Sequence, residues 1–255
     1  MESIAFEPSA PQSGLRAYHR VTRTATYGFL MALPLLVLYE GLIWLVNQGE
    51  VMQVRISAEV WMKQVLPTLG TTGMHVLALV VLLIGIGIYF YERKKHIPLR
   101  PRYMGWIIGE SAVYAVVLAF LVSVVVGMIF AAAPAGAQMD EQGLWTKLAL
   151  SIGAGLYEEL LFRVLLVGGM FAVLQIVLSA KKRTLAYVIA ALVGALLFSW
   201  VHYIGALGDP FTLSSFTFRF LFGLALNVVF LVRGFAVAAW THALYDVMIV
   251  TGLLG

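Results

Sequence analysis

The stretch that decides the fold is residues 104–132, which read MGWIIGESAVYAVVLAFLVSVVVGMIFAA. Its only ionisable side chain of the Asp, Glu, Lys or Arg type is Glu110, and the run exceeds the roughly 20 apolar residues that a helix needs to cross a bilayer. Hydrophobic residues make up 61% of the chain and charged residues 12%, whereas soluble domains carry about a quarter charged residues. A soluble fold of 255 residues cannot bury so much apolar surface. The sequence therefore predicts a polytopic membrane protein.

Six more apolar runs accompany this one. The predicted spans are residues 27–46, 73–91, 104–132, 145–179, 185–204, 215–232 and 234–252. The fourth run is too long for one straight crossing, so we expect it either to extend beyond the bilayer or to break near Gly168 and Gly169. Residues 51–66 mix apolar and charged residues, as interfacial helices do, and an eighth span there or in the fourth run is the alternative. Because no run alternates with a period of two, the predicted fold is all-α, a polytopic membrane helix bundle of about seven to eight transmembrane helices.

The distribution of Lys and Arg predicts the orientation. Residues 1–26 form a polar N-terminal segment, and residues 27–255 are predicted to form a single integral membrane domain. The loops and helix ends on one predicted side of the membrane hold 12 Lys and Arg residues. They lie in the N-terminal segment, at 93–102, at 181–183 and at Arg233. Because Lys and Arg in short loops favour the cytoplasm, the N-terminus is predicted to be cytoplasmic and the C-terminus to lie outside. The same rule accounts for the basic residues, so no nucleic-acid partner is expected.

Three motifs place ionisable residues inside or at the ends of apolar runs. Residues 158–163 read EELLFR, residues 198–202 read FSWVH and residues 242–246 read HALYD. An ionisable side chain at membrane depth costs about 2.5–3.5 kcal/mol on insertion scales, so each calls for a partner or a function. Glu40 and Glu110 are the other acids within the runs, and for both we favour a structural role.

Helical spacing separates the two glutamates of the first motif. Glu159 and Arg163 are four residues apart with the acid first, which favours an ion pair on one helix face. Glu158 is turned about 100° away from Glu159 at 3.6 residues per turn. We therefore expect Arg163 to neutralise Glu159 and Glu158 to remain available for general acid and base chemistry.

The second and third motifs add two imidazoles. His242 and Asp246 are also four residues apart, so the acid can orient the imidazole or share a face with it. His202 supplies a second imidazole from another helix, and Phe198 is interpreted as packing. Together with the two glutamates, these groups can activate a water, hold it and stabilise an oxyanion, which is typical of a hydrolytic site.

At these motifs the chain resembles the CPBP family of intramembrane proteases, which includes CAAX prenyl endopeptidases of the Rce1 type and bacteriocin-processing or self-immunity proteins. The family pattern EExxxR, FxxxH and Hxxx(N/D) is matched in order, and the resemblance covers about residues 145–250. It implies an intramembrane endopeptidase that hydrolyses a peptide bond of a membrane-embedded or lipid-modified, CAAX-type substrate. It also implies that Glu158 and His202 activate the attacking water, with Glu159 and Arg163 as the supporting pair.

The implied oxyanion group is His242 with Asp246, which stands where many members have Asn. An ionised Asp cannot donate a hydrogen bond, so Asp246 is either protonated or orients His242. No cofactor is expected, and a zinc site of His202, His242 and Glu158 is the mechanistic alternative, because three N or O ligands plus water form an open catalytic site. The chain has no Cys, which removes thiol catalysis.

Two other functions remain open from the residues alone. One is a non-proteolytic membrane binding or immunity module of the same fold, in which the motifs lock the helices together. The other is a small transporter or proton relay, which intramembrane Glu and His also suggest. The expected partners are membrane lipid and a peptide or protein substrate in the membrane, and the sequence does not define an oligomeric state.

Overall fold

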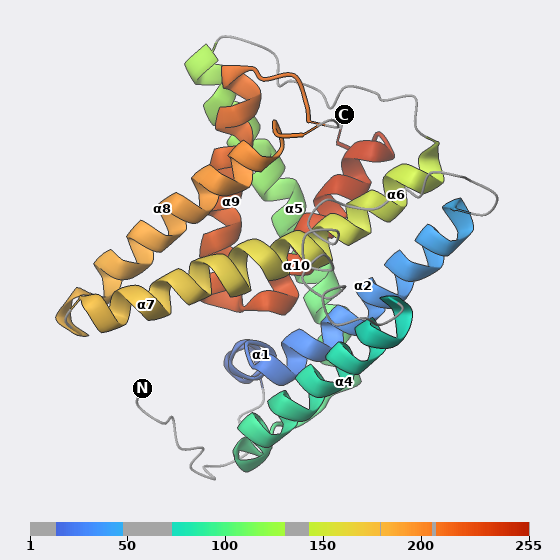
Figure 1. The fold of residues 1–255 in the computed structure, drawn as a ribbon, viewed down its shortest axis with the longest axis vertical. Helices are drawn as coiled ribbons and strands as arrows, with labels where there is room; N and C mark the ends of the chain where they lie inside the picture. Colours follow the sequence, from blue (N-terminus) through green and yellow to red (C-terminus); the bar gives the residue numbers. More distant parts are fainter. Residues whose placement is uncertain (1–13, 48–72, 131–142, 179, 206–207, 255) are drawn as a thin grey trace.

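The computed structural model describes residues 14–47, 73–130, 143–178, 180–205 and 208–254 (Figure 1). Every regular element within these ranges is helical, which confirms the all-α prediction. The interfacial helix expected at residues 51–66 lies outside the described part of the chain.

The described residues form the following helices in chain order. Their bounds are α1 (Leu15–Thr22), α2 (Ala25–Val46), α4 (Gly73–Glu92), η2 (Arg93–Lys95), α5 (Pro101–Phe130), α6 (Leu144–Gly153), η3 (Ala154–Glu158), η4 (Leu160–Gly168), α7 (Gly169–Val177), η5 (Ala180–Lys182), α8 (Arg183–Val201), α9 (Leu213–Arg233) and α10 (Phe235–Val250). From α6 to α7 the backbone stays helical, and we call Leu144–Val177 the long helix.

Five of the described helices are long and apolar enough to cross a membrane, namely α2, α5, the long helix, α8 and α9. The chain is therefore a multi-pass membrane protein. The 20 residues of α4 lie in another predicted span. At 16 residues, α10 is about 24 Å long, which is less than the roughly 30 Å of a hydrocarbon core.

The long helix does not break at its glycine pair, so that alternative was wrong. Gly168 has φ −64° and Gly169 has φ −65°, both ordinary helical values. The turns instead widen over η3 and η4, which have π-helical hydrogen bonding from residue i to residue i+5. Such widened turns are rare and occur frequently at functional sites, and here they carry the first motif.

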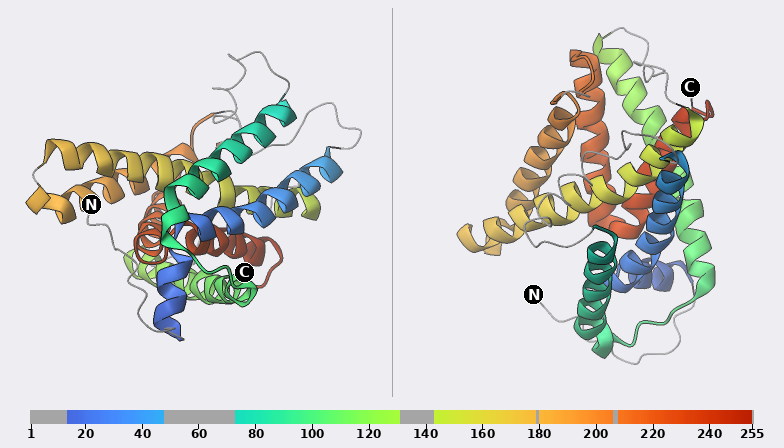
Figure 2. Two further views of the ribbon diagram at one scale, coloured as in Figure 1. Left: turned by 90° about the horizontal axis from the view of Figure 1, so that it is seen from below. Right: turned by 45° about the vertical axis from the view of Figure 1, so that its right-hand side comes forward.

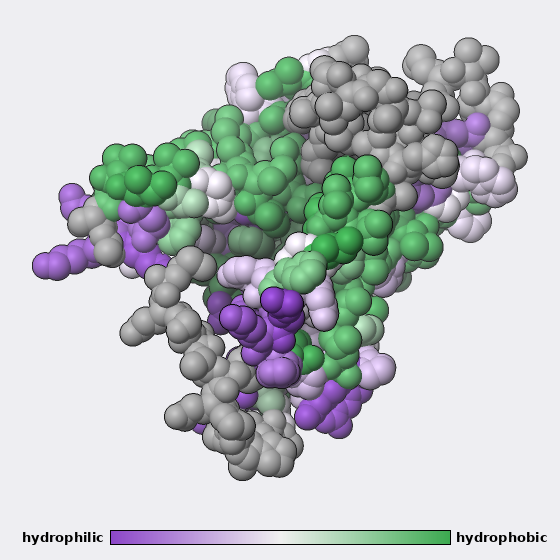
Figure 3. Space-filling model, turned by 60° about the horizontal axis from the view of Figure 1, so that its bottom comes forward, coloured by the Kyte–Doolittle hydropathy of each residue, from purple (hydrophilic) through white to green (hydrophobic). Residues whose placement is uncertain are grey.

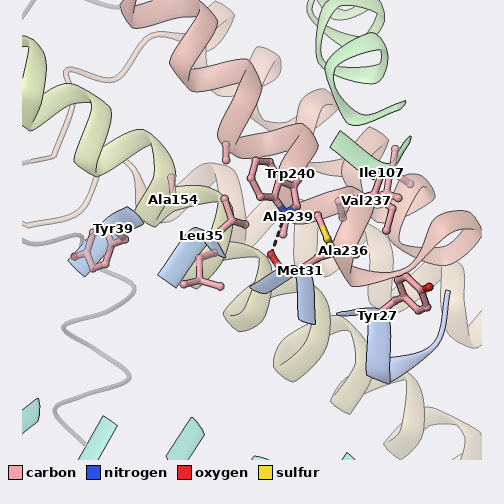
Figure 4. Close-up of a cluster of buried hydrophobic side chains, with 14 of the residues drawn as sticks. Tyr27, Met31, Leu35, Tyr39, Ile107, Ala154, Ala236, Val237, Ala239 and Trp240 are labelled. Carbon is pink, nitrogen blue, oxygen red and sulfur yellow. Dashed lines mark hydrogen bonds between the residues drawn. The ribbon is translucent and has the colours of Figure 1, made fainter. Parts of the chain in front are cut away.

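The short helix α10 lies at the centre of the molecule. It contacts α2, α5, α6, η3, η4 and α9, and every side chain from Ala236 to Ala243 is buried. Most of these residues are small, which lets neighbouring helices approach closely. The indole N–H of Trp240 donates to the Met31 carbonyl oxygen of α2 at 2.9 Å, and thereby ties α10 to the first span (Figure 4).

The close approach of the long helix to α10 depends on Gly155. A Cβ atom at this position would lie 2.5 Å from the Ala243 Cβ and 2.6 Å from the Ala239 carbonyl oxygen. The sequence thus allows backbone-to-backbone contact one turn before the Glu158–Glu159 pair. This contact sets the distance between the first and third motifs.

The basic helix ends lie together, as the orientation argument requires. The Tyr27 hydroxyl donates to the Pro98 carbonyl oxygen at 3.1 Å and accepts from the Arg100 N–H at 2.9 Å, which joins the start of α2 to the segment before α5. Helix α4 packs against α2 (Figure 2). Viewed from below, the surface combines broad apolar areas with separate groups of hydrophilic residues (Figure 3). Which side faces the cytoplasm stays a prediction.

Candidate active site

The Glu159 carboxylate is completely buried and has two partners. Its Oε2 lies 3.0 Å from Arg163 Nε, so the predicted ion pair is present. Its Oε1 accepts from His242 Nδ1 at 2.7 Å, a contact between the first and third motifs that the sequence did not predict. A carboxylate at 0% exposure needs such compensation, because an unpaired buried charge is very costly. Glu159 therefore acts as the link between two helices.

Arg163 is held by an aromatic ring as well as by Glu159. Its guanidinium carbon lies 4.4 Å from the centroid of the Phe198 ring, a cation–π contact. Its Nη2 donates to the Gly223 carbonyl oxygen of α9 at 3.4 Å. A Cβ atom on Gly223 would come within 2.9 Å of Phe198, so glycine is needed for α9 to approach.

Phe198 lies between the two histidines. Its ring centroid is 5.1 Å from that of His202 and 5.8 Å from that of His242, both in edge arrangements. These contacts fit the interpretation of Phe198 as a packing residue. Phe198 is on the same helix as His202, and its ring sets the spacing of the two imidazoles.

Glu158 is not committed to Arg163 and faces His202. Its Oε2 lies 3.9 Å from His202 Nε2, and this oxygen is buried without a hydrogen-bond partner. The Phe198 carbonyl oxygen is 2.7 Å from His202 Nδ1. Because a carbonyl only accepts, Nδ1 carries a proton, and in the neutral ring the Nε2 lone pair points toward Glu158. A separation above 3.5 Å leaves the two groups suited to share a water.

His242 has carboxylates on both ring nitrogens. Its Nδ1 contacts Glu159, and its Nε2 lies 3.5 Å from the Asp246 Oδ2 on the same helix. The side chain is 5% exposed, and that of Asp246 is 28% exposed. Asp246 therefore lies between His242 and the more open part of the site, in the position from which it can orient the ring or meet a ligand.

The six predicted residues form two adjacent sets of contacts, which the Phe198 ring joins through both histidines. They come from the widened part of the long helix, from the end of α8 and from α10, and they are Glu158, Glu159, Arg163, His202, His242 and Asp246. An uncommitted acid with its facing imidazole therefore lies beside a second, acid-held imidazole, and the Phe198 ring contacts both imidazoles.

The sequence did not predict a polar network that lies beside His202. Arg219 of α9 donates to the Tyr203 hydroxyl at 2.7 Å and to the Ser215 hydroxyl at 2.8 Å, and it forms an ion pair with Asp209. The Asp209 N–H donates to the His202 carbonyl oxygen at 2.8 Å. The segment after α8 is thereby fixed to α9 next to the catalytic candidates. The sequence feature that could have predicted this network is Arg219, a cation inside the apolar run of α9.

The side chains of the candidate site bear on whether it could hold a metal ion. Within the described ranges, no group of three His, Asp or Glu side chains is placed to hold a metal ion. Of the three ligands of the zinc alternative, His202 faces Glu158, whereas His242 contacts Glu159 and Asp246 instead.

Residues 140–248 match the family model of the Rce1-like type II CAAX prenyl endopeptidases. This stretch is Rce1-like. It contains all three motifs and runs from α6 almost to the end of α10. The resemblance inferred from the motifs is confirmed, and it indicates a protease, a hydrolase of peptide bonds, in general terms.

The match leaves α1, α2, α4 and α5 outside the Rce1-like region. These helices nevertheless contribute to the same fold, because α2 and α5 pack directly against α10. Comparison with curated proteins and with solved structures gives no match.

Proposed function

We propose that the chain is an intramembrane endopeptidase of the CPBP type, which hydrolyses a peptide bond of a membrane-embedded or lipid-modified, CAAX-type substrate. The observation that carries the proposal is the division of labour between two adjacent glutamates. Glu159 is occupied by Arg163 and His242, whereas the Glu158 Oε2 lacks a hydrogen-bond partner and faces His202 across 3.9 Å. A purely structural helix lock has no use for the second acid.

In the proposed reaction, a water lies between Glu158 and His202 Nε2. The Glu158 carboxylate takes a proton from the water while the water oxygen attacks the scissile carbonyl carbon. His202 holds the water by accepting a hydrogen bond at the Nε2 lone pair. When the tetrahedral intermediate collapses, the C–N bond breaks and Glu158 returns the proton to the leaving amine. The products are a new carboxyl terminus and a new amino terminus.

The proposed oxyanion donor is His242. In its imidazolium form the ring keeps Nδ1–H on Glu159 and presents Nε2–H beside Asp246, at the more open side of the ring. A preorganised charged donor of this kind stabilises the oxyanion where its charge develops. Glu159 and Arg163 are then positioning residues, and Asp246 keeps the ring oriented.

The zinc alternative would use His202, His242 and Glu158 as ligands. Since the described side chains do not gather into a three-ligand group, we favour the water activated by glutamate. Cleavage by the purified protein is expected to survive treatment with a zinc chelator. Loss of cleavage with chelator and its return with added zinc would favour the metal mechanism instead.

The direct test is cleavage by the purified full chain in proteoliposomes. A library of lipid-modified and unmodified peptides is added, and the products are identified by mass spectrometry. Glu158→Gln is expected to lower the rate about 10²- to 10⁴-fold, as loss of a general base does. Its unfolding midpoint should stay close to that of the wild type, because the side chain keeps its shape.

The matched control is Glu110→Gln, the same change in a carboxylate on α5 that lies away from the motifs. It should retain cleavage per folded molecule. Equal cleavage by wild type and Glu158→Gln would contradict the proposed role. A folded wild type that cleaves nothing, with an unchanged phenotype for Glu158→Gln in cells, would favour the binding or immunity module.

A further inference from the structure

A pocket of about 390 Å³ lies between the end of the long helix, the start of α8 and the end of α9. This volume is within the range of roughly 300–1,000 Å³ that is usual for ligand sites. The residues used below are Val167, Phe171, Arg183, Thr184, Tyr187 and Leu231, and we call this site the Arg183 pocket. None of the six motif residues lines the pocket.

The wall of the Arg183 pocket is mainly apolar and aromatic. The Phe171 and Tyr187 rings meet edge to face with centroids 5.9 Å apart. The Tyr187 hydroxyl donates to the Asn227 backbone carbonyl oxygen at 2.6 Å, which fixes this wall to α9. Leu231 is 48% exposed. Such a wall suits a hydrocarbon chain better than a free polar solute.

The rim of the pocket is strongly basic. The Arg183 guanidinium carbon lies 5.8 Å from the centroid of the Phe171 ring, and within the described residues Arg183 has no carboxylate partner. Lys181 and Lys182 precede it and are exposed. Arg23, from the turn between α1 and α2, donates to the Leu231 carbonyl oxygen at 3.0 Å. Arg183 therefore lines the pocket, and a second arginine from a distant part of the chain contacts the backbone of one lining residue.

The N-terminus of α8 adds donors at the same place. No side chain caps this terminus, and its first turn contains no acidic residue. Backbone N–H groups at a helix start favour an anion. The Thr184 hydroxyl, which also lines the pocket, adds a further hydrogen-bond donor.

The surroundings of the pocket are those of a membrane border. Ile176 and Val177 at the end of the long helix are 86% and 73% exposed, while the basic run from Lys181 follows directly. Apolar side chains of this exposure face lipid, and Lys and Arg next to them face the headgroups. Basic pockets between transmembrane helices at such borders bind anionic lipid headgroups.

We propose that the Arg183 pocket binds one anionic phospholipid of the surrounding leaflet. The phosphate lies at Arg183, Thr184 and the start of α8. One acyl chain lies along Phe171 and Leu231. The chemistry of the pocket selects both parts of the ligand, since the rim is cationic and the wall is apolar. The inference is independent of the proposed protease activity.

The test measures lipid binding to the purified full chain by native mass spectrometry and by the unfolding midpoint in nanodiscs. Phosphatidylglycerol in a phosphatidylcholine background is expected to bind and to raise the midpoint, whereas phosphatidylcholine alone does not. Arg183→Gln should weaken phosphatidylglycerol binding about fivefold, the effect of one cation near an anionic headgroup. Its midpoint in phosphatidylcholine alone should be unchanged, because the side chain is exposed.

Arg93→Gln is the matched control. Arg93 is also exposed and stacks on a phenylalanine, with its guanidinium carbon 5.1 Å from the centroid of the Phe90 ring, but it is not part of the pocket. Equal losses for Arg183→Gln and Arg93→Gln would overturn the proposal in favour of general surface charge. Inorganic phosphate that raises the midpoint as much as phosphatidylglycerol would overturn it in favour of a simple anion site.

A second variant tests the apolar half without changing the charge. Leu231→Trp fills the space expected for the acyl chain and should weaken phosphatidylglycerol binding while all the cations remain. Unchanged binding by this variant would contradict the assignment of the chain to the pocket, whatever the result for Arg183.

Discussion

Two buried arginine–carboxylate clusters hold this molecule together, and they differ in how completely their polar atoms are used. The Glu110 cluster consists of Tyr18, Glu110 and Arg233. Glu110 accepts from Arg233 Nε at 2.5 Å, from Arg233 Nη2 at 2.8 Å and from the Tyr18 hydroxyl at 2.6 Å. The remaining Arg233 donors reach the His19 carbonyl oxygen and the Thr22 hydroxyl. This cluster ties α1, α5 and α9 together, and each of the three guanidinium nitrogens of Arg233 has a hydrogen-bond partner.

The Glu159 cluster consists of Glu159, Arg163 and His242, and it is less complete. The Arg163 Nη1 and the neighbouring Glu158 Oε2 are buried without a hydrogen-bond partner. The 3.0 Å approach of Arg163 Nε to Glu159 Oε2 is an ion pair that lacks hydrogen-bond alignment. Unsatisfied buried groups in a native structure call for an explanation, and functional sites are a common one.

The two clusters show how a structural ion pair can be distinguished from a functional one in the interior of a membrane protein. Both clusters contain an arginine that is 1% exposed. The one whose groups are all used is a helix lock, and the one beside unused groups is the candidate site. The predictions that follow test this distinction.

Loss of Arg163 has the largest expected effect. Arg163→Met leaves Glu159 buried without its cation, which typically costs about 3–5 kcal/mol of unfolding free energy. The same change removes a partner of the carboxylate that holds His242. The cleavage rate per folded molecule should therefore fall in addition to the loss of stability. Denaturant unfolding in detergent, with cleavage rates normalised to folded protein, separates the two effects.

Loss of Arg233 should lower the free energy of unfolding as much as loss of Arg163 does, but it should leave the cleavage rate unchanged. Arg233→Met leaves Glu110 uncompensated and is expected to cost a similar amount, about 3–5 kcal/mol. Cleavage per folded molecule should stay near the wild-type rate. A specific loss of catalysis in this variant would remove the contrast between the clusters.

Gly155→Ala should have an intermediate effect. The added Cβ would meet Ala243 and Ala239 at 2.5–2.6 Å, and such overpacking costs about 1–3 kcal/mol. It also moves Glu159 away from His242, so the cleavage rate should fall. Gly109→Ala on α5 is the matched control, because a Cβ there meets nothing within 4 Å. Equal behaviour of the two variants would contradict the role of close packing.

Asp246→Asn should have the smallest effect. The Asp246 Oδ2 lies 3.5 Å from His242 Nε2, and an Asn side chain of the same shape can still orient the ring. We expect cleavage within about tenfold of the wild type, which corresponds to about 1.4 kcal/mol. A loss comparable to that of Glu158→Gln would instead make Asp246 a direct participant.

Much of the architecture follows from local sequence. Each of the seven apolar runs contains a helix, because run length and apolarity determine spanning segments directly. The Glu159–Arg163 pair was also predictable, because four-residue spacing is local geometry. The break at Gly168 was not borne out, since glycine permits a bend without requiring one, and both residues keep helical backbone angles.

The contacts between motifs could not be read from spacing. Glu159 and His242 are 83 residues apart, and their hydrogen bond depends on how closely the long helix packs on α10. The residues that permit this approach, Gly155, Ala239 and Ala243, have side chains without functional groups, and their spacing along the chain does not predict that they meet. Widened helical turns likewise have no simple sequence signal. The part of the site that the sequence missed is therefore the part that packing creates.

The central claim is that Glu158 activates a water for peptide hydrolysis. The most direct measurement compares the termini of proteins and peptides in membranes from cells that carry the wild type or Glu158→Gln at equal, folded levels. The account predicts new amino and carboxyl termini, paired at the same peptide bond, with the wild type alone. Identical termini in both samples, with a phenotype that still depends on the protein, would contradict it.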